Sequence, residues 1–448
     1  MKQQTAKKKP VLLKKKVDFW KRVVFFLTMI VFFVVGLLWF FRPTSSQLEK
    51  RELTHFPAFT PAAFWDGSYF SQIDTWYADT FPWREGLMTA NTYFRSLYGI
   101  QTEQMFGEHQ VAEEIPDTTS GDTSRAELEE TVEPVPPATT VDGAIQAPPE
   151  SAGSVYLSGD RAYSLYYFGQ ENSDRYAAIL NAYYDNIKAA NSSANVYSIL
   201  APLAYGIDFS DEVLDEMNWS HEDQAIDYLF SRMDGGILKV DPFDTLRSHQ
   251  DEYLYFRTDH HWTALGAYYA YSDFCQVKGI APHDLSSFNT LTFDNFLGTM
   301  YASSNQAPAL AANPDTVIAY EPNGVKTLTA HQADGTVLEN YRIIADVSTW
   351  NSSSKYNCFI AGDQPYEEIH NPNITDGSSA VVVKDSYGNA FVPFLVDHYQ
   401  DVYVIDFRYY SGSISQFVGQ NQIDDVIFLN NLNATGAKSL LDSLQRCL

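Results

Sequence analysis

The longest apolar run of the chain lies close to its N-terminus. Residues 23–41 are almost wholly apolar for nineteen residues, which suffices to cross a bilayer core of about 30 Å. A basic flank precedes the run, and Arg42 with acidic sequence follows it, which predicts a cytoplasmic N-terminus. A cleaved signal peptide is the alternative, but the run is long for one and no small-x-small cleavage pattern follows it. We therefore expect a basic cytoplasmic tail (1–22), a single transmembrane helix (23–41) and an extracytoplasmic remainder.

Two contrasting regions follow the apolar run. Residues 43–107 are rich in aromatic residues and contain helical apolar spacing from 71 to 98, interrupted at Pro82. We expect this membrane-proximal region to pack on the main domain. Residues 108–153 are acidic, rich in Thr, Ser and Pro, and contain no Phe, Trp or Tyr. Because such a segment cannot bury enough apolar surface to offset the entropy of ordering, it is predicted to be a disordered linker.

The pattern from 154 to 448 is that of an α/β domain. Helical runs begin at Ser173 and Thr263, and the second is expected to stop at Gly279. Strand-like apolar runs recur at 196–201, 237–240, 358–361, 380–383, 402–405 and 426–429. Strands that alternate with helices predict a mostly parallel sheet with helices on both faces. Residues 288–350 break the alternation with short strands and Asn-Gly and Asp-Gly turns, which predicts a β-hairpin insertion over one edge.

Charge and cysteine content narrow the class of protein. The chain has a net charge of −26, although residues 1–22 carry nine Lys and Arg against one Asp. The part beyond residue 42 is therefore strongly acidic, which argues against nucleic acid as a partner. Three cysteines, Cys275, Cys358 and Cys447, form no disulfide framework.

Residues 258–263 (Thr-Asp-His-His-Trp-Thr) gather side chains capable of proton chemistry. In an extended loop, Asp259 and His261 share one side while His260 faces away. A carboxylate beside an imidazole is the base and its orienting group in a nucleophilic triad. A purely structural motif is the alternative. A zinc site is a further alternative, but adjacent histidines rarely converge on one ion and no second ligand cluster is evident, so we expect no metal.

A candidate nucleophile lies far downstream, at Ser386. It follows the apolar run 380–383 and precedes an amphipathic segment, so it is predicted at the carboxyl end of a strand and the N-terminus of a helix. Free backbone N–H groups there can stabilise a developing oxyanion. An ordinary helix cap formed by Asp385 and Ser386 is the alternative.

These two motifs, together with the Val-Ile-Asp-Phe-Arg-Tyr segment at 404–409, resemble the DHHW-motif proteins. That family is similar to the SGNH-type enzymes of alginate and related exopolysaccharide O-acetylation. The resemblance covers roughly 43–107 and 155–448, and it implies an SGNH-hydrolase-like fold with Ser386, His261 and Asp259 as the triad. Lys384 stands where an ordinary SGNH hydrolase has Gly, and the order of the triad is reversed.

The sequence does not decide which groups would stabilise an oxyanion. Candidates are the amides of Ser386 and Gly388, Asn389, and the turn formed by Gly362 and Asp363. Asn430 and Asn431 follow the last strand and are further candidates, or caps of a turn. His260 and Trp262 are candidates for support of the site.

The resemblance implies a membrane-anchored, extracytoplasmic O-acetyltransferase that acts on a cell-surface or secreted polysaccharide. It needs no cofactor, and the acetyl donor would be delivered by a membrane-bound O-acyltransferase. An acetyl-esterase with the same triad is one alternative. A catalytically inert polysaccharide-binding or assembly subunit is another.

Overall fold

The computed structural model describes residues 154–448 without interruption. Before them it describes residues 19–31, 42, 44–46, 51–61, 64, 68–84, 86–87, 90, 103–107, 112–116, 140–141 and 144–145. The chain forms two compact units, Met1–Asn91 and Thr92–Leu448. The predicted membrane-proximal region, residues 43–107, spans the boundary between these two units.

The first unit contains few described elements. Residues 19–31 are helical, and the rest of the predicted span, residues 32–41, lies outside the described residues. Within the described part of the chain, no helix is both long and apolar enough to cross a membrane. Strands β1 (Ser45–Ser46) and β2 (Arg51–Glu52) pair antiparallel, and helix α3 spans Ser68–Asp79. Arg42 lies over the ring of Trp76 in α3 and donates a hydrogen bond to Thr80 Oγ1 at 2.9 Å.

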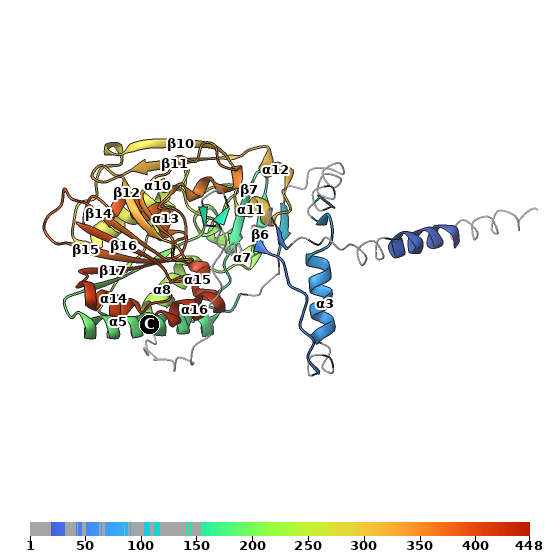
Figure 1. The fold of residues 1–448 in the computed structure, drawn as a ribbon, viewed down its shortest axis with the longest axis horizontal. Helices are drawn as coiled ribbons and strands as arrows, with labels where there is room; N and C mark the ends of the chain where they lie inside the picture. Colours follow the sequence, from blue (N-terminus) through green and yellow to red (C-terminus); the bar gives the residue numbers. More distant parts are fainter. Residues whose placement is uncertain are drawn as a thin grey trace, which may run out of the picture. The chain divides into compact units, whose positions relative to one another are not determined.

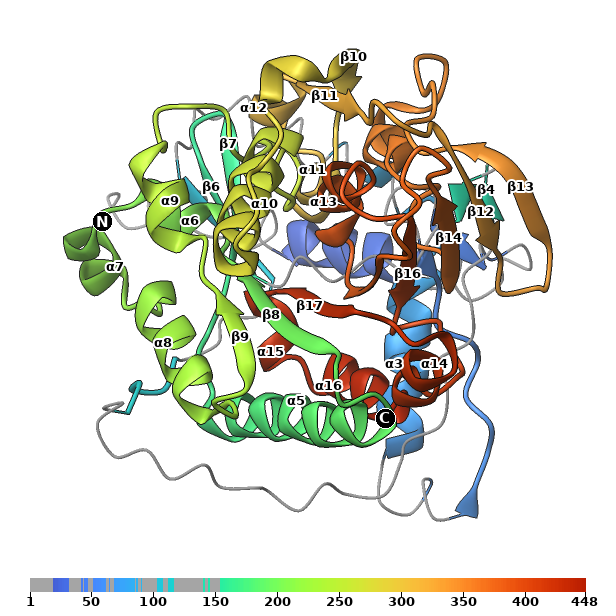
Figure 2. The ribbon, with the colours of Figure 1, turned by 90° about the vertical axis from the view of Figure 1, so that its left-hand side faces the viewer.

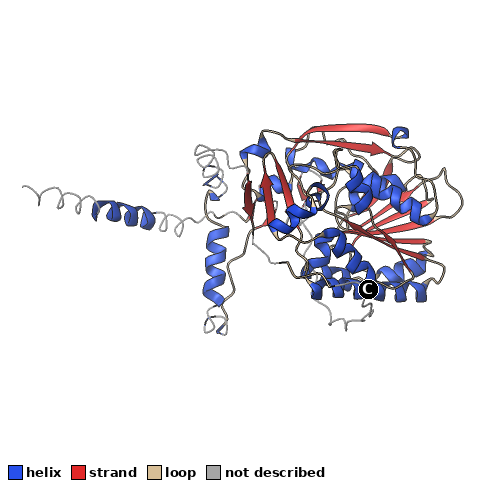
Figure 3. Cartoon of the chain, turned by 180° about the vertical axis from the view of Figure 1, so that it is seen from behind, coloured by secondary structure: helices blue, strands red, loops and turns tan. Residues whose placement is uncertain are grey.

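The second unit is an α/β domain built on one eight-stranded mixed sheet, visible as the fan of strands in Figure 3. The strand order is β13-β12-β14-β16-β15-β17-β8-β9. The strands are β8 (Asn195–Ala201), β9 (Ile237–Val240), β12 (Thr327–His331), β13 (Val337–Arg342), β14 (Tyr366–His370), β15 (Ser379–Lys384), β16 (Asp401–Asp406) and β17 (Asp425–Asn431). The five strands from β16 to β9 are parallel, and β14, β12 and β13 continue the sheet antiparallel.

Helices cover both faces of this sheet, as predicted (Figures 1 and 2). On one face α5 (Gln170–Ala190) packs with α8 (Glu222–Arg232), α14 (Ile414–Asn421) and α16 (Lys438–Arg446). On the other face α10 (Ala264–Lys278) packs against α13 (Gly388–Leu395). Short helices complete the domain: α6 (Ala204–Asp208), α7 (Asp211–Met217), α9 (Phe243–Ser248), η1 (Leu285–Ser287), α11 (Thr299–Ser303), α12 (Pro308–Ala311), η2 (Ser352–Cys358) and α15 (Leu432–Gly436).

Two central parallel strands, β15 and β17, are buried on both sides, which explains their apolar runs. Every residue of β15 and of β17 is buried. Helix α10 begins and ends as its sequence predicts, because the Thr263 hydroxyl accepts a hydrogen bond from Gly266 N and Gly279 adopts a left-handed conformation (φ 80°) at the C-cap. The three cysteines are buried and free.

The region predicted as a β insertion divides between two sheets. β10 (Asn289–Phe296) and β11 (Asp315–Glu321) form a separate antiparallel pair over α10 and α13, whereas β12 and β13 extend the main sheet. The strand predicted at 358–361 is wrong. That segment is the end of η2 followed by a tight turn, in which Ile360, Ala361 and Gly362 all have positive φ. The apolar run fills the core, and its backbone pairing is limited to a single antiparallel bridge between Phe359 and Ile344.

The structure describes some of the residues next to and within the predicted linker, residues 108–153. Strand β3 (Glu103–Phe106) pairs with β6 (Ser154–Ser158), which pairs with β7 (Arg161–Leu165). Glu113, expected in the disordered linker, instead docks on the domain: its N–H donates to Phe168 O at 3.0 Å, and its side chain accepts from Gln170 N at 2.8 Å. Two further short strands, β4 (Thr140–Val141) and β5 (Ala144–Ile145), pair antiparallel. Residues 117–139 and 146–153 lie outside the described residues.

Acid should weaken this fold through His398, which follows α13. Tyr271 of α10 donates a hydrogen bond to His398 Nε2 at 2.5 Å, and the imidazole of His283 lies beside that of His398. Burial, and then His283, lower the pKa of His398 from 6.5 to about 4. The unfolded chain therefore binds this proton more readily than the folded chain, so stability falls as pH falls from about 6.5 to about 4. We expect His398→Gln to reduce the loss of Tm between pH 7 and pH 5, measured by thermal unfolding beside the wild type. An equal loss of Tm in both proteins would contradict this prediction.

Candidate active site

Ser386 lies just beyond the carboxyl end of β15, which runs between the parallel strands β16 and β17. Asp385 holds the turn into α13 from both sides. Its Oδ1 accepts from Tyr387 N at 2.9 Å, and its Oδ2 accepts from the backbone and side-chain nitrogens of Asn431 at 2.7 and 3.0 Å. These bonds tie the ends of β15 and β17 together. The serine is thereby fixed where sites of open α/β sheets are expected.

The loop 258–263 is held in place by Asp315, the first residue of β11. Asp315 Oδ2 accepts hydrogen bonds from Thr258 N at 2.8 Å and Thr258 Oγ1 at 2.6 Å. Trp262 forms a single β-bridge with Tyr255, and Thr263 then caps α10. The chain bends sharply through residues 257–261. The loop is therefore a fixed turn and not the extended segment that the sequence suggested.

This turn brings Asp259 and His261 to Ser386. His261 Nδ1 lies 2.5 Å from Asp259 Oδ1, and His261 Nε2 lies 2.7 Å from Ser386 Oγ. Because a carboxylate can only accept, Nδ1 carries the proton and Nε2 is free to accept from the serine hydroxyl. Each of the three residues is at most 5 % exposed. The arrangement can move a proton from the serine to an oriented imidazole.

Asp259 is kept ionised by its surroundings. Burial alone would raise the pKa of its carboxyl, but the charge and hydrogen bond of His261, followed by His260 and the Thr299 amide, hold the pKa well below its ordinary value. Thr299 donates to Asp259 Oδ2 from its backbone N at 2.8 Å and from its hydroxyl at 3.1 Å. Both carboxylate oxygens are therefore engaged, which fixes the carboxylate plane facing His261.

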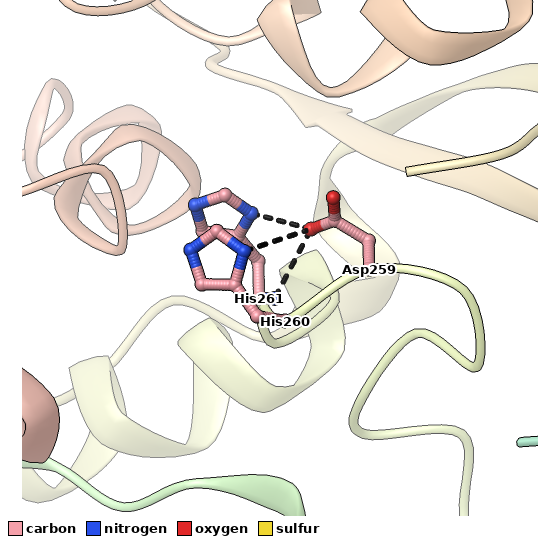
Figure 4. A group of neighbouring side chains, drawn as sticks. All are labelled: Asp259, His260 and His261. Carbon is pink, nitrogen blue, oxygen red and sulfur yellow. Dashed lines mark hydrogen bonds and ion pairs between the residues drawn. The ribbon is translucent and has the colours of Figure 1, made fainter. Parts of the chain in front are cut away.

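His260 does not face away from the site, so that part of the prediction is wrong. Figure 4 shows both imidazoles on the same side of the turn, facing Asp259. Their ring centroids lie 3.9 Å apart, and His260 Nδ1 lies 4.0 Å from Asp259 Oδ1. The alternation of side chains fails because the loop is bent. His260 Nδ1 instead bonds the hydroxyl of Thr299 at 2.6 Å, so it supports the residue that holds Asp259.

Aromatic side chains link the loop 258–263 to the turn around Ser386, which we call the serine turn. Trp262 Nε1 donates to Tyr387 O at 2.9 Å, and the Tyr387 hydroxyl donates to His260 O. Tyr356 of η2 stacks on His261 and donates to Ser386 O at 2.9 Å. Trp262 therefore contacts the turn that carries Ser386, whereas nothing in the sequence indicated the contact of Tyr356 with His261.

Most of the groups expected to stabilise an oxyanion form hydrogen bonds to other parts of the protein. Gly388 N donates to Asp385 O and Gly362 N to Phe359 O, at 3.0 and 2.8 Å. Asn389 Nδ2 donates to Asp363 Oδ1 at 2.9 Å. Asn430 Oδ1 accepts a hydrogen bond from the Tyr176 hydroxyl at 2.9 Å, and Asn431 Nδ2 donates to Asp385 Oδ2 at 3.0 Å. The amides of Gly388 and Gly362 and the side chain of Asn431 therefore form turn contacts, whereas Asn430 Nδ2 is buried without a hydrogen-bond partner among the residues that the structure describes.

A buried charge network lies under the serine turn. Lys384 Nζ lies 3.0 Å from Asp406 Oδ2 and 3.2 Å from Asp363 Oδ1, and Arg408 bonds both carboxylates. Burial would raise the pKa of Asp363, but Arg408 and Lys384 hold that pKa well below its ordinary value. The lysine that replaces the usual glycine is therefore a structural cation, which also explains the Asp406-Phe407-Arg408 segment that follows β16.

A metal is the alternative use of the Asp-His-His group. Asp259, His260 and His261 each offer a ligand atom, and these atoms lie within 4.8 Å of one another. The same atoms are engaged in bonds to protein partners, and an ion would have to displace the bonds from His261 to Asp259 and Ser386. The bonding pattern fits a proton relay better than a set of metal ligands.

The comparisons with known proteins identify the family. The DHHW protein family matches residues 49–135 and 122–405, and the chain belongs to that family. A DHHW family protein from Eubacterium siraeum is similar in structure at 30 % identity, with a TM-score of 0.59, over 69 % of this chain and 98 % of the other. The resemblance seen in the sequence is confirmed.

A more distant structure shares the fold. Bacillus cereus PatB1, solved with a sulfonyl adduct, is 18 % identical with a TM-score of 0.53 over 64 % of this chain and 98 % of the other. The O-acetyltransferase domain of Pseudomonas putida AlgJ also matches, at 12 % identity and a TM-score of 0.32 over 64 % of this chain and 97 % of the other. No curated protein sequence matches this chain.

Proposed function

We propose that this protein is an extracytoplasmic O-acetyltransferase of the SGNH type, with Ser386 as nucleophile, His261 as general base and Asp259 as its orienting group. The observation that carries the proposal is the continuous path from Asp259 Oδ1 through both ring nitrogens of His261 to Ser386 Oγ, at 2.5 and 2.7 Å. Membership of the DHHW family supports it.

The proposed reaction has two balanced halves. Ser386 Oγ attacks the acetyl carbonyl as its proton passes to His261 Nε2, and collapse of the tetrahedral intermediate breaks the ester bond while the imidazolium protonates the leaving oxygen. An acceptor hydroxyl then attacks the acetyl-serine as its proton passes to His261 Nε2. Collapse of the second tetrahedral intermediate breaks the bond between Ser386 Oγ and the acetyl carbon, and the imidazolium returns the proton to Ser386 Oγ. The family resemblance makes a polysaccharide hydroxyl the proposed acceptor and a membrane-bound O-acyltransferase the proposed source of acetyl groups. No metal or cofactor takes part.

The test begins with the nucleophile. The full chain is treated with phenylmethylsulfonyl fluoride and mapped by peptide mass. We expect one adduct, on Ser386, that is absent from Ser386→Ala and forms far more slowly in His261→Ala. Labelling at another serine, or equal labelling of His261→Ala, would overturn the assignment.

Transfer and hydrolysis are then separated by their products. With a small acetyl ester as donor, an O-acetylated oligosaccharide is expected in addition to free acetate when a soluble oligosaccharide acceptor is supplied. Release of acetate alone across a panel of acceptors would favour the esterase. No Ser386-dependent turnover of the donor would favour an inert subunit.

The membrane anchor is a separate part of the proposal. It rests on the apolar run 23–41 and its basic flank, whose described part, residues 19–31, is a helix with apolar side chains that are mostly exposed, such as Phe25 and Leu27. Protease added to intact cells is expected to digest the chain beyond residue 42, whereas a cytoplasmic control protein stays intact. Protection of the whole chain would place the domain on the other side of the membrane.

A further inference from the structure

Tyr356 occupies a position over the proposed base that the triad chemistry does not account for. Its ring lies face to face with the imidazole of His261, with centroids 3.9 Å apart and planes 11° apart. Its hydroxyl donates to the carbonyl oxygen of Ser386 at 2.9 Å. One side chain thus touches both the proposed base and the backbone of the proposed nucleophile.

The segment that carries Tyr356 is itself firmly held. The neighbouring Lys355 is buried, and its ammonium donates to Val347 O and Ser348 O, both at 2.9 Å. Phe256 and Phe359 pack edge-on against Tyr356. Burial, followed by the charge of Asp259, raises the pKa of Tyr356 well above its ordinary value, so its hydroxyl stays protonated and remains a donor. The ring is consequently a fixed neutral surface against His261.

We propose that Tyr356 is a positioning residue that stabilises the imidazolium formed on His261 during catalysis and holds it in line with Ser386. The face of an aromatic ring carries partial negative charge and attracts a cation, most strongly where water is excluded. When His261 takes the serine proton, it becomes such a cation with Asp259 at its edge and Tyr356 on its face. The inference rests on the proposed function, because it assigns the imidazolium a place in that reaction.

Two substitutions separate the ring from the hydroxyl. Tyr356→Phe keeps the stacked ring and loses the bond to Ser386 O, whereas Tyr356→Leu removes the ring and keeps an apolar neighbour. For Tyr356→Leu we expect kcat/KM for a small acetyl ester to fall about 3- to 30-fold, and the acid limb of the pH profile of kcat/KM to move about half to one pH unit lower. For Tyr356→Phe we expect the acid limb at the wild-type pH, with a smaller loss of kcat/KM.

A matched control separates this effect from loss of packing. Phe274 of α10 is fully buried, and its ring packs edge-on against those of Tyr197 and Phe391. Phe274→Leu is expected to lower Tm without moving the acid limb. Tyr356→Met, which also fills the site without a ring, takes the place of Tyr356→Leu if the leucine variant does not fold.

The experiment is run on the full chain, with the rate of sulfonylation of Ser386 measured beside ester turnover. An acid limb at the wild-type pH in a folded Tyr356→Leu or Tyr356→Met variant overturns the role of Tyr356 while leaving the triad intact. The role of Tyr356 is also overturned if Phe274→Leu moves the acid limb to lower pH by as much as Tyr356→Leu does. If Ser386 of the wild type is not labelled at all, the proposed function fails and this inference fails with it.

Discussion

Ser386→Ala and His261→Ala are each expected to lower the turnover of a small acetyl ester by about 10³- to 10⁶-fold. The reason is that the two side chains share one proton path, in which His261 Nε2 lies 2.7 Å from Ser386 Oγ. Removing either end abolishes the same step, so the double variant should be little worse than either single one. Initial rates on a chromogenic acetyl ester, with folding checked by circular dichroism, measure all three variants.

The adjacent histidine is the matched control for this experiment. His260 is buried and aromatic like His261, but its Nδ1 bonds Thr299 Oγ1 at 2.6 Å. We expect His260→Ala to act only through a shift of Thr299 and Asp259, with a loss of no more than about 100-fold. If His260→Ala abolishes turnover while His261→Ala retains it, the base is His260. If Ser386→Ala stays fully active, the triad is wrong and a metal-dependent or inert protein becomes the better interpretation.

The sequence predicted those parts of the site that lie at the ends of regular elements. The strand that precedes Ser386 is a run of buried apolar residues, and the helix after the Asp-His-His-Trp turn has an N-cap threonine and a C-cap glycine. Both signals are local, because burial on both faces and capping geometry each leave a mark in the sequence. The α/β class could therefore be anticipated from local signals, whereas the grouping of Asp259, His261 and Ser386 came from the resemblance to the DHHW-motif proteins.

What the sequence could not predict depends on contacts between distant segments. The bend that turns His260 toward Asp259 is held by Asp315, which lies more than fifty residues downstream. Tyr356 is one of 29 tyrosines, and nothing in its neighbourhood marks it as the residue that stacks on His261. The run 358–361 has the composition of a strand but fills the core as a turn, since packing overrides intrinsic β-propensity.

Gly298 provides the second large expected effect, and it rests entirely on one such distant contact. This glycine is the N-cap of α11, and its φ of −88° is accessible to any residue, so its backbone does not require glycine. Space does. A Cβ at this position would lie 2.1 Å from Asp259 Oδ2 and 2.2 Å from Asp259 Cβ, both far inside van der Waals contact.

Gly298→Ala is accordingly expected to push Asp259 away from His261 and to lower kcat/KM for the acetyl ester by about 10²- to 10⁴-fold, because misplacement by about 1 Å and loss of the orienting carboxylate have costs in that range. Gly169 is a matched control, since it is also a helix N-cap with an ordinary φ (−137°), and a Cβ there meets nothing within 4 Å. Gly169→Ala should leave kcat/KM unchanged. The test is to measure kcat/KM and Tm of both variants. If Gly298→Ala is folded and as active as the wild type, then Asp259 does not have to stay where the structure places it. Its orienting role must then be abandoned.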